Sequence, residues 1–290
     1  MHLERKSPSK VNLLLNILGK RPDGFHELET VLQPVGLFDE MRFERGGNGI
    51  HLTCDEPALP VDSRNLIYRA ADAFLKLQNL RDGVRIHLQK KIPLAAGLGG
   101  GSGNAATTLL ALNELFARPL SPAKLTEVAA ALGSDVPFFL QNRPALATGR
   151  GEKIQPLDLF PALRGRVFLL IHPGFGISTP WAYQALARFP DALNGRRGRA
   201  ERLIAWLQAG DWRAAGGEFY NSLEAPALEK YPVLALFQEF LSANGALAAL
   251  MSGSGSTTFA IAENQTAAES LVEKFKSRFG QSCWMTVVPV

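Results

Sequence analysis

The chain has few of the residues that build metal sites and disulfide frameworks. It contains two cysteines, Cys54 and Cys283, and five scattered histidines, and neither set shows metal or redox spacing. We therefore expect no metal held by protein side chains alone. The sequence also lacks any apolar run near the roughly 20 residues that a membrane helix needs. No membrane-spanning segment is expected.

A strong charge of either sign is absent too. The 31 Lys and Arg residues against 27 Asp and Glu residues leave a net charge of +4. The densest basic stretch, 196–202, is short and typical of a solvated surface, and nucleic-acid binding would need a larger basic footprint. Residues 1–6 carry charges with no apolar segment behind them, unlike a secretory leader, so we expect a cytoplasmic protein.

What is present is a mixture of strand and helix patterns in a chain of 290 residues, 46% of them hydrophobic, enough to bury a large core. Strands are expected at 11–18, 29–33, 41–44, 50–53, 84–89, 167–171, 247–250, 257–262 and 283–288. Helices are expected at 65–77, about 102–116, from Ser121-Pro122 onward and at 266–278, with helical patterns also dominating 179–241. The order of elements in the tail indicates an α+β second domain, with domains at 1–155 and 156–290.

The most informative stretch runs from Pro93 to Ala106. It packs five glycines into residues 97–103 and then passes directly into a strong helix-forming segment. Glycine lets the backbone approach a ligand closely, and a helix start offers free N–H groups and the positive end of a dipole. This glycine run therefore predicts an anion site, at which phosphate is the usual anion.

Two common phosphate motifs fit the glycine run poorly. A Walker A loop needs a lysine after its last glycine, and none follows here. Residues 101–106 match the dinucleotide pattern G-x-G-x-x-A, but a polar segment precedes them and no acidic residue ends a second strand about 20 positions later. A loop kept only for tight packing is a third interpretation, which the chain-entropy cost of five glycines disfavours.

Three further segments, read together with the glycine run, indicate a family. Lys10 and Asn12 stand two residues apart and so share one face of the first strand. Asp135 lies among apolar residues at the end of a helix, and residues 251–257 form a second glycine–serine turn. In these segments the chain resembles the GHMP kinases.

Segments 21–30, 149–152, 172–174 and 178–183 extend this resemblance over nearly the whole chain. Within segment 21–30, the discriminating part is Arg-Pro-Asp-Gly-Phe-His-Glu at 21–27. It is similar to the family members that phosphorylate a sugar alcohol linked to cytidine diphosphate, in the non-mevalonate route to isoprenoids.

The resemblance implies an α+β, two-domain GHMP kinase fold. Its N-terminal domain is an ATP-binding domain like ribosomal protein S5, its C-terminal domain an α/β sandwich, and its active site lies in the cleft between them. It also implies ATP as co-substrate with Mg²⁺, a small-molecule substrate, no nucleic-acid or membrane partner, and a monomer or weak homodimer. The residues expected to bind ATP are Pro93, Leu94, Ala95, Ala96, Gly97, Leu98, Gly99, Gly100, Gly101, Ser102 and Gly103, with Asn65 and Leu66 on the adenine side.

Two residues are expected to be catalytic. Asp135 would accept the proton of the attacking hydroxyl, and Lys10 would neutralise charge near the transferred phosphoryl group. Ser102 is the candidate for a hydroxyl on the Mg²⁺ side. For the cytosine the resemblance implies stacking between Phe25 and Tyr183, with His26 bonding the edge of the base. Asn12, Thr179, Gly253 and Ser254 complete the expected substrate site.

Ordinary structural roles compete with these assignments. Asp135 could cap a helix or pair in the core, Lys10 could be an edge-strand lysine with a solvated tip, and Phe25 and Tyr183 could simply pack. The chain also departs from the family pattern at Phe25, Gly103 and Ser256, where tyrosine, serine and proline are common. Alternative functions are a GHMP kinase acting on homoserine or a mevalonate derivative, and a nucleotide-binding protein without turnover. The latter has no use for both Lys10 and Asp135.

Overall fold

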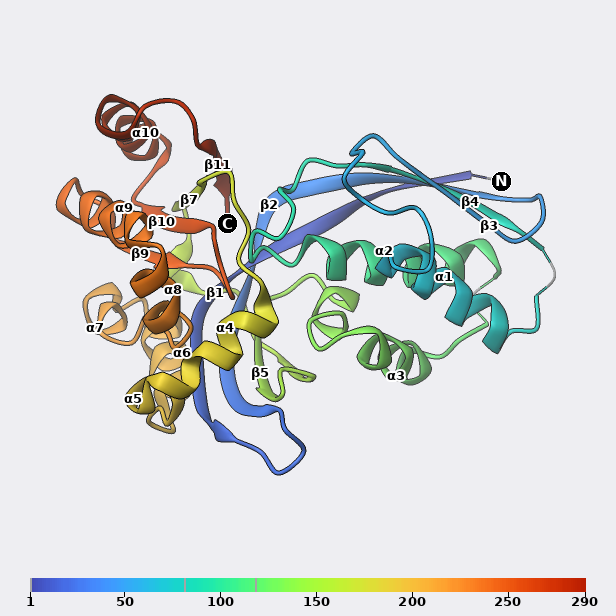
Figure 1. Cartoon of the computed structure of the whole chain (residues 1–290), viewed down its shortest axis with the longest axis horizontal. Helices are drawn as coiled ribbons and strands as arrows, with labels where there is room; N and C mark the ends of the chain where they lie inside the picture. Colours follow the sequence, from blue (N-terminus) through green and yellow to red (C-terminus); the bar gives the residue numbers. More distant parts are fainter. Residues whose placement is uncertain (1, 81, 118) are drawn as a thin grey trace. The chain divides into compact units, whose positions relative to one another are not determined.

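The computed structural model (Figure 1) describes residues 2–80, 82–117 and 119–290. It separates into two compact units: unit 1 comprises residues 1–9, 37–92 and 99–142, and unit 2 comprises 10–36, 93–98 and 143–290. Two long strands, β1 (His2–Lys20) and β2 (His26–Arg45), run through both units. Each unit contains several separate segments of the chain, so the units do not correspond to the two continuous domains expected at 1–155 and 156–290. That domain boundary stays a prediction.

Unit 1 contains part of a sheet with helices on one face. In it β3 (Ile50–Cys54) pairs in parallel with β4 (Val84–Gln89), and β4 pairs antiparallel with residues 40–45 of β2. Residues of β4 alternate strictly between buried and exposed, which is typical of a sheet with one covered face. The helices α1 (Leu66–Leu77), α2 (Gly100–Leu115) and α3 (Pro122–Leu132) lie on that face (Figure 1), and the short helix η1 (Pro137–Leu140) follows α3.

The sequence sets where the helices of unit 1 begin. Asn65 caps α1 by accepting a hydrogen bond from the N–H of Ile67, and Ser121 caps α3 with Pro122 as the first helical residue. Helix α2 begins at Gly100, two residues before the expected start. Gly99 is its N-cap in the left-handed region, with φ of 72°, a conformation that glycine adopts without steric cost.

Unit 2 contains a second, separate sheet. It is antiparallel, in the order β11 (Trp284–Pro289), β7 (Val167–His172), β10 (Thr258–Ala262), β9 (Ala248–Met251). The hairpin of β5 (Ala145–Gly149) and β6 (Lys153–Pro156) pairs with residues 28–32 of β2, and β8 (Tyr220–Asn221) pairs in parallel with Leu14 and Leu15 of β1.

Helices fill the rest of unit 2. They are α4 (Thr179–Ala185), α5 (Pro190–Leu193), α6 (Arg199–Ala209), α7 (Trp212–Gly216), α8 (Glu224–Lys230), α9 (Pro232–Ala243) and α10 (Gln265–Phe279), with the short helices η2 (Pro161–Leu163) and η3 (Leu186–Arg188). Phe237 of α9 and Phe275 of α10 meet edge to face, 4.8 Å between ring centroids, in the core that also holds Leu169 and Ile171 of β7.

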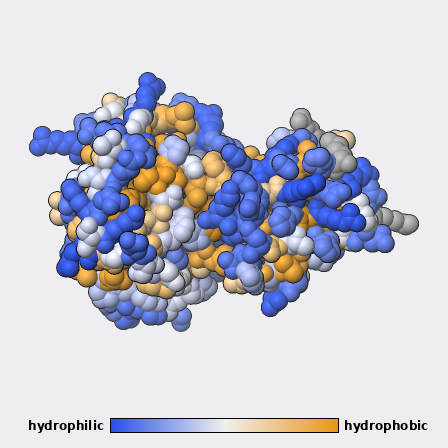
Figure 2. Space-filling model, turned by 90° about the horizontal axis from the view of Figure 1, so that it is seen from above, coloured by the Kyte–Doolittle hydropathy of each residue, from blue (hydrophilic) through white to orange (hydrophobic). Residues whose placement is uncertain are grey.

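On the face seen in Figure 2, hydrophilic residues predominate and hydrophobic ones form patches between them. Within residues 2–80, 82–117 and 119–290, no helix combines the length and the apolar character needed to span a membrane.

The α+β class and most of the expected elements are confirmed. The strands expected at 29–33 and 41–44 are in fact one strand, β2, because the backbone continues extended through Pro34 and Gly36. The strand expected at 11–18 begins at His2. The short strands β5, β6 and β8 were not predicted, since segments of two to five residues are too short for alternation to stand out.

Candidate active site

Lys10 is the buried centre of the candidate site. Its side chain comes from β1 in unit 2 and the residue is 3% exposed. The ammonium Nζ donates hydrogen bonds to Oδ1 of Asn12 at 2.6 Å and to the carbonyl oxygen of Gly97 at 2.7 Å. The expectation that Lys10 and Asn12 share a face is confirmed, and an edge-strand lysine with a solvated tip is excluded. These two bonds fix the position of the ammonium group.

The glycine run and the glycine–serine turn meet beside Lys10. Gly97 has φ of +77°, and a Cβ on it would lie 2.0 Å from the carbonyl oxygen of Ser252, so only glycine fits here. The hydroxyl of Ser252 donates to the Gly97 carbonyl at 3.0 Å. A Cβ on Gly253 would lie 3.1 Å from Lys10 Nζ. Unit 2 therefore brings together the first strand, the start of the glycine run and the last turn, as the site prediction requires.

A second group of predicted residues gathers around His26. Its ring lies 5.2 Å from that of Tyr183, centroid to centroid. Burial, and then the nearby charge of Lys20, lower the pKa of His26, so a neutral imidazole at neutral pH offers one donor and one acceptor. Phe25 is 51% exposed, and the Arg150 guanidinium lies 4.5 Å from its ring centroid. An exposed aromatic residue is thus present, while the pairing of Phe25 with Tyr183 around a base stays a prediction.

Two hydroxyl groups of the expected substrate site also meet. Thr179 begins α4, and its Oγ1 lies 2.8 Å from Oγ of Ser254. Asn12 is tied to β2, because its Nδ2 donates to Oγ1 of Thr30 at 2.8 Å. Its amide oxygen accepts from Lys10, so the Asn12 side chain is held at both ends.

In unit 1 the glycine run forms the first turn of α2. The N–H groups of Gly100, Gly101 and Ser102 precede the first intrahelical donor, Gly103, whose N–H bonds the Gly99 carbonyl. Gly101 is exposed and Ser102 is half-buried. This helix start has the donors that an anion site needs.

Leu66 and Asn65 differ in how they relate to the glycine run. A Cβ on Gly101 would lie 3.8 Å from Cδ1 of Leu66, so Leu66 is a neighbour of the run. The amide of Asn65 caps α1 and donates to the Pro60 carbonyl at 2.8 Å. The structure thus gives the Asn65 side chain a structural role, and its contact with adenine stays a prediction.

Asp135 lies in unit 1, after the end of α3 at Leu132 and before the buried η1. It is half-buried and leads into the buried residues Val136 to Phe139. This placement fits a carboxylate of restricted solvent access. Its role as a base stays a prediction.

Sequence reasoning missed two residues that support the glycine–serine turn. Asn221 of β8 is 1% exposed, and its Nδ2 donates to the carbonyl oxygens of Met251 and Gly253, both at 2.8 Å. Glu224, the first residue of α8, accepts the N–H of Met251 at 2.7 Å. In the sequence, Asn221 and Glu224 are recognisable only as two polar residues inside the segment 179–241, where helical patterns dominate. Their contacts depend on β8, which the pattern does not show.

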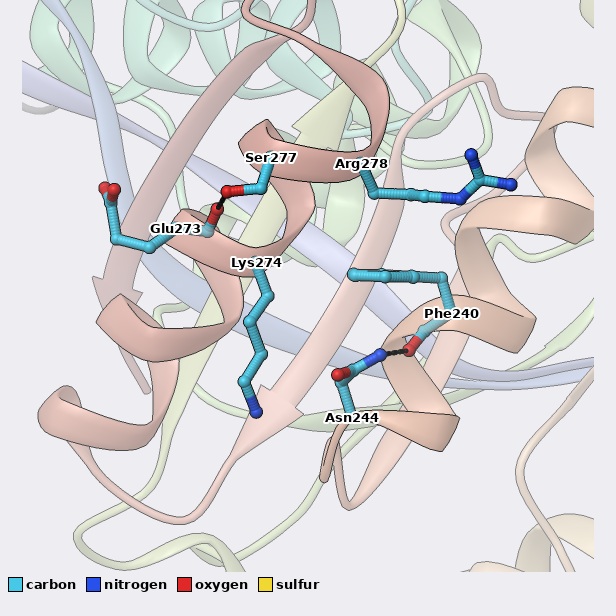
Figure 3. A pocket seen from close by; sticks show the side chains of 6 residues that line it. All are labelled: Phe240, Asn244, Glu273, Lys274, Ser277 and Arg278. Carbon is cyan, nitrogen blue, oxygen red and sulfur yellow. Dashed lines mark hydrogen bonds between the residues drawn. The ribbon is translucent and has the colours of Figure 1, made fainter.

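One surface pocket lies elsewhere in unit 2, between α9 and α10 (Figure 3). Phe240, Asn244, Glu273, Lys274, Ser277 and Arg278 line it. The polar ends of Asn244 and Ser277 bond backbone carbonyls of their own helices. None of the predicted site residues lines this pocket, and it has no part in the candidate site.

Across the described ranges, no three His, Cys, Asp or Glu side chains are grouped so that they could hold a metal ion.

Comparisons with known proteins identify the family of the chain. A family model described as the GHMP kinases N-terminal domain matches residues 65–143, and one described as the GHMP kinases C-terminal domain matches residues 189–281. A solved homoserine kinase from Cytophaga hutchinsonii is 21% identical with a TM-score of 0.78, over 100% of this chain and 94% of that one, and it shows the shared fold alone.

Closer relatives share one name. A protein from Pelotomaculum thermopropionicum is 40% identical over 92% of both chains, and one from Geobacter sulfurreducens is 39% identical over 95% of both. Both are named 4-diphosphocytidyl-2-C-methyl-D-erythritol kinase. A crystal structure of 4-(cytidine 5'-diphospho)-2C-methyl-D-erythritol kinase is 36% identical with a TM-score of 0.82, over 99% of this chain and 100% of that one. The chain therefore belongs to the GHMP kinases and, within them, to the 4-diphosphocytidyl-2-C-methyl-D-erythritol kinase family.

Proposed function

We propose that the chain uses ATP to phosphorylate the 2-hydroxyl of 4-diphosphocytidyl-2-C-methyl-D-erythritol. The products are the 2-phosphate and ADP, and the reaction is a step of the non-mevalonate (methylerythritol phosphate) pathway to isoprenoid precursors. The observation that carries the proposal is the buried Lys10 held on the Gly97 carbonyl, where the glycine run and the turn at Gly253 meet. Relatives about 40% identical over most of the chain support this substrate.

In this reaction the protein supplies position and charge. The free N–H groups at the start of α2 would bind ATP phosphates, and the ammonium of Lys10 would stabilise negative charge on the transferred group. Asp135 would accept the proton of the attacking hydroxyl. Phe25, His26 and Tyr183 would hold the cytosine by stacking and by hydrogen bonds to its edge, with Asn12, Thr179, Gly253 and Ser254 around the rest of the substrate.

Mg²⁺ would enter together with ATP, held by phosphate oxygens with Ser102 as the candidate protein ligand. It would supply neutralising charge to the phosphate oxygens. We further propose that the enzyme acts in the cytoplasm, as a monomer or weak homodimer, without nucleic-acid or membrane partners.

The direct test is an assay of the purified chain with ATP, Mg²⁺ and 4-diphosphocytidyl-2-C-methyl-D-erythritol, following ADP release. Parallel reactions contain homoserine or mevalonate as the only acceptor. We expect turnover with the cytidylyl substrate alone. Turnover with another alcohol and none with this one would reject the proposal, and binding without turnover would identify a nucleotide-binding protein.

Asp135→Asn tests the base. Asparagine keeps the size and polarity of the side chain but cannot take up a proton, so we expect kcat to fall by roughly 10²-fold or more. Steady-state kinetics on both substrates measure the change, with Asp72→Asn, a half-buried aspartate of α1, as the matched control. If the variant keeps wild-type turnover, Asp135 only positions the hydroxyl.

Tyr183→Ala tests stacking on the cytosine. Stacking of a base on an aromatic ring contributes about 1–3 kcal/mol, so KM for the cytidylyl substrate should rise about 10-fold while KM for ATP stays near wild type. Tyr183→Phe retains the ring and should bind the substrate almost normally. Equal KM values for Tyr183→Ala and the wild type would show that this ring only packs against His26.

A further inference from the structure

A buried carboxylate contacts the chain on both sides of the glycine run. Asp39 of β2 is fully buried and accepts four hydrogen bonds, all within unit 1. Its Oδ1 accepts the backbone N–H groups of Lys91 and Ile92, both at 2.8 Å. Its Oδ2 accepts from Lys90 Nζ at 2.7 Å and from Asn104 Nδ2 at 2.9 Å. Ile92 immediately precedes the run 93–103 and Asn104 immediately follows it, so one side chain connects its two ends.

Lys90 also binds Ile92, the residue that precedes the run. Its Nζ donates to the carbonyl oxygen of Ile92 at 2.6 Å, so both the N–H and the C=O of Ile92 are fixed by the ion pair of Asp39 and Lys90. Burial lowers the pKa of Lys90, and the adjacent Asp39 carboxylate opposes that shift. A Cβ on Gly100 would lie 3.1 Å from Cγ2 of Ile92. The first residue of α2 therefore rests against the same fixed segment.

Asn104 attaches the first turn of α2 to two strands. Its residue is 2% exposed, and Nδ2 donates to Oγ of Ser7 on β1 at 2.9 Å as well as to Asp39 on β2. The strands and the helix are labelled in Figure 1. Hydrogen bonds to one carboxylate thus hold the residue just before the glycine run and the residue just after it.

We propose that Asp39 is a positioning residue for ATP binding, which orders the ends of the glycine run before the nucleotide arrives. The inference rests on the proposed function for the identity of the ligand. A run with five glycines loses much conformational entropy on ordering, and ordering it in advance removes that cost from binding. An apolar pair could stabilise a core equally well. A charged pair at Asp39 and Lys90 is therefore explained by the hydrogen bonds with which it fixes the backbone at Lys91 and Ile92.

The test compares Asp39→Asn with the wild type in two measurements. Asparagine can still accept from Lys91 and Ile92, but its amide group would face the donors of Lys90 and Asn104. In nucleotide-free protein we expect the amides of residues 91–104 to exchange with solvent ~10-fold faster or more, with those of α10 unchanged. By calorimetry, Kd for a non-hydrolysable ATP analogue should rise ~10-fold, with Kd for the cytidylyl substrate within about 2-fold.

Two further variants separate positioning from general destabilisation. Adding Asn104→Asp to Asp39→Asn exchanges the acid and the amide, which restores a hydrogen bond between positions 39 and 104 and should recover part of the lost ATP affinity. Asp55→Asn is the matched control, because the exposed Asp55 accepts the N–H of Lys90 at 2.7 Å without touching either end of the run. It should leave exchange and ATP affinity unchanged.

The inference is overturned if Asp39→Asn leaves the exchange of residues 91–104 unchanged, or if it weakens both ligands equally. If Asp39→Asn does not fold, Asn104→Ala removes the helix side of the connection alone. The Asn104→Ala variant should show faster amide exchange at residues 100–104 and a several-fold higher Kd for the ATP analogue. If both quantities equal those of the wild type, the inference is overturned. Failure of the wild type to bind ATP would instead reject the proposed function, and exchange in nucleotide-free protein would still show whether Asp39 orders the run.

Discussion

Replacing Lys10 with methionine is expected to lower kcat by about 10³-fold while the protein stays folded. The ammonium donates to the oxygens of Asn12 and Gly97, which place it beside the turn at Gly253, where it would stabilise charge on a transferred phosphoryl group. Methionine has similar length but no charge. The Gly97 carbonyl keeps the hydroxyl of Ser252 as a donor, which limits the structural damage. Pre-steady-state phosphoryl transfer together with thermal unfolding would measure both effects.

Lys6→Met is the matched control for this variant, because Lys6 lies on the same strand and is exposed. It should keep the wild-type kcat. Lys10→Arg should also be poorly active, since Gly253 approaches the ammonium closely and leaves little room for a guanidinium. A Lys10→Met enzyme with near-normal kcat, or an equally inactive Lys6→Met, would contradict a role for Lys10 in the reaction.

The parts of the site that could be predicted are those where local sequence determines geometry. Residues two apart on a strand share a face, so Lys10 beside Asn12 followed from spacing alone. The glycine run predicted a helix start with free N–H groups, and α2 begins there. In these cases the structure depends on neighbouring residues, and periodicity or turn chemistry contains the necessary information.

The parts that could not be predicted arise from contacts across long stretches of chain. Strand β8 has two residues and exists because it pairs with Leu14 and Leu15, about 200 positions earlier. Asn221 supports the turn at Gly253 only through that pairing. Asp39 likewise looks like one polar residue near the end of an apolar segment, and its four bonds appear only after the strand and the helix are packed. Short-range patterns do not encode such contacts.

Glu224 should make the protein less stable as pH rises from acid to neutral. Burial raises the pKa of this carboxyl from 4.5 to about 7, against the hydrogen bonds from Met251 and Gln238, which lower it. The folded state then binds the proton more tightly than the unfolded state. Its stabilising contribution is complete below about pH 4.5 and is lost as pH rises through about 7. A shift of this size corresponds to about 3 kcal/mol in the free energy of unfolding.

Glu224→Gln removes this titration while keeping an oxygen that can accept from Met251 and Gln238. Relative to the wild type, the variant should therefore gain about 3 kcal/mol of stability between pH 4.5 and pH 8, measured by urea unfolding at several pH values. Glu239→Gln, at an exposed position of α9, should follow the wild-type pH dependence. Parallel stability curves for Glu224→Gln and the wild type would show that the buried carboxyl ionises as readily in the folded chain as in the unfolded one. Glu224 also accepts the N–H of Met251, next to the turn at Gly253 that approaches Lys10. Ionisation of the Glu224 carboxyl is therefore expected to change kcat over the same pH range, and Glu224→Gln should remove that change.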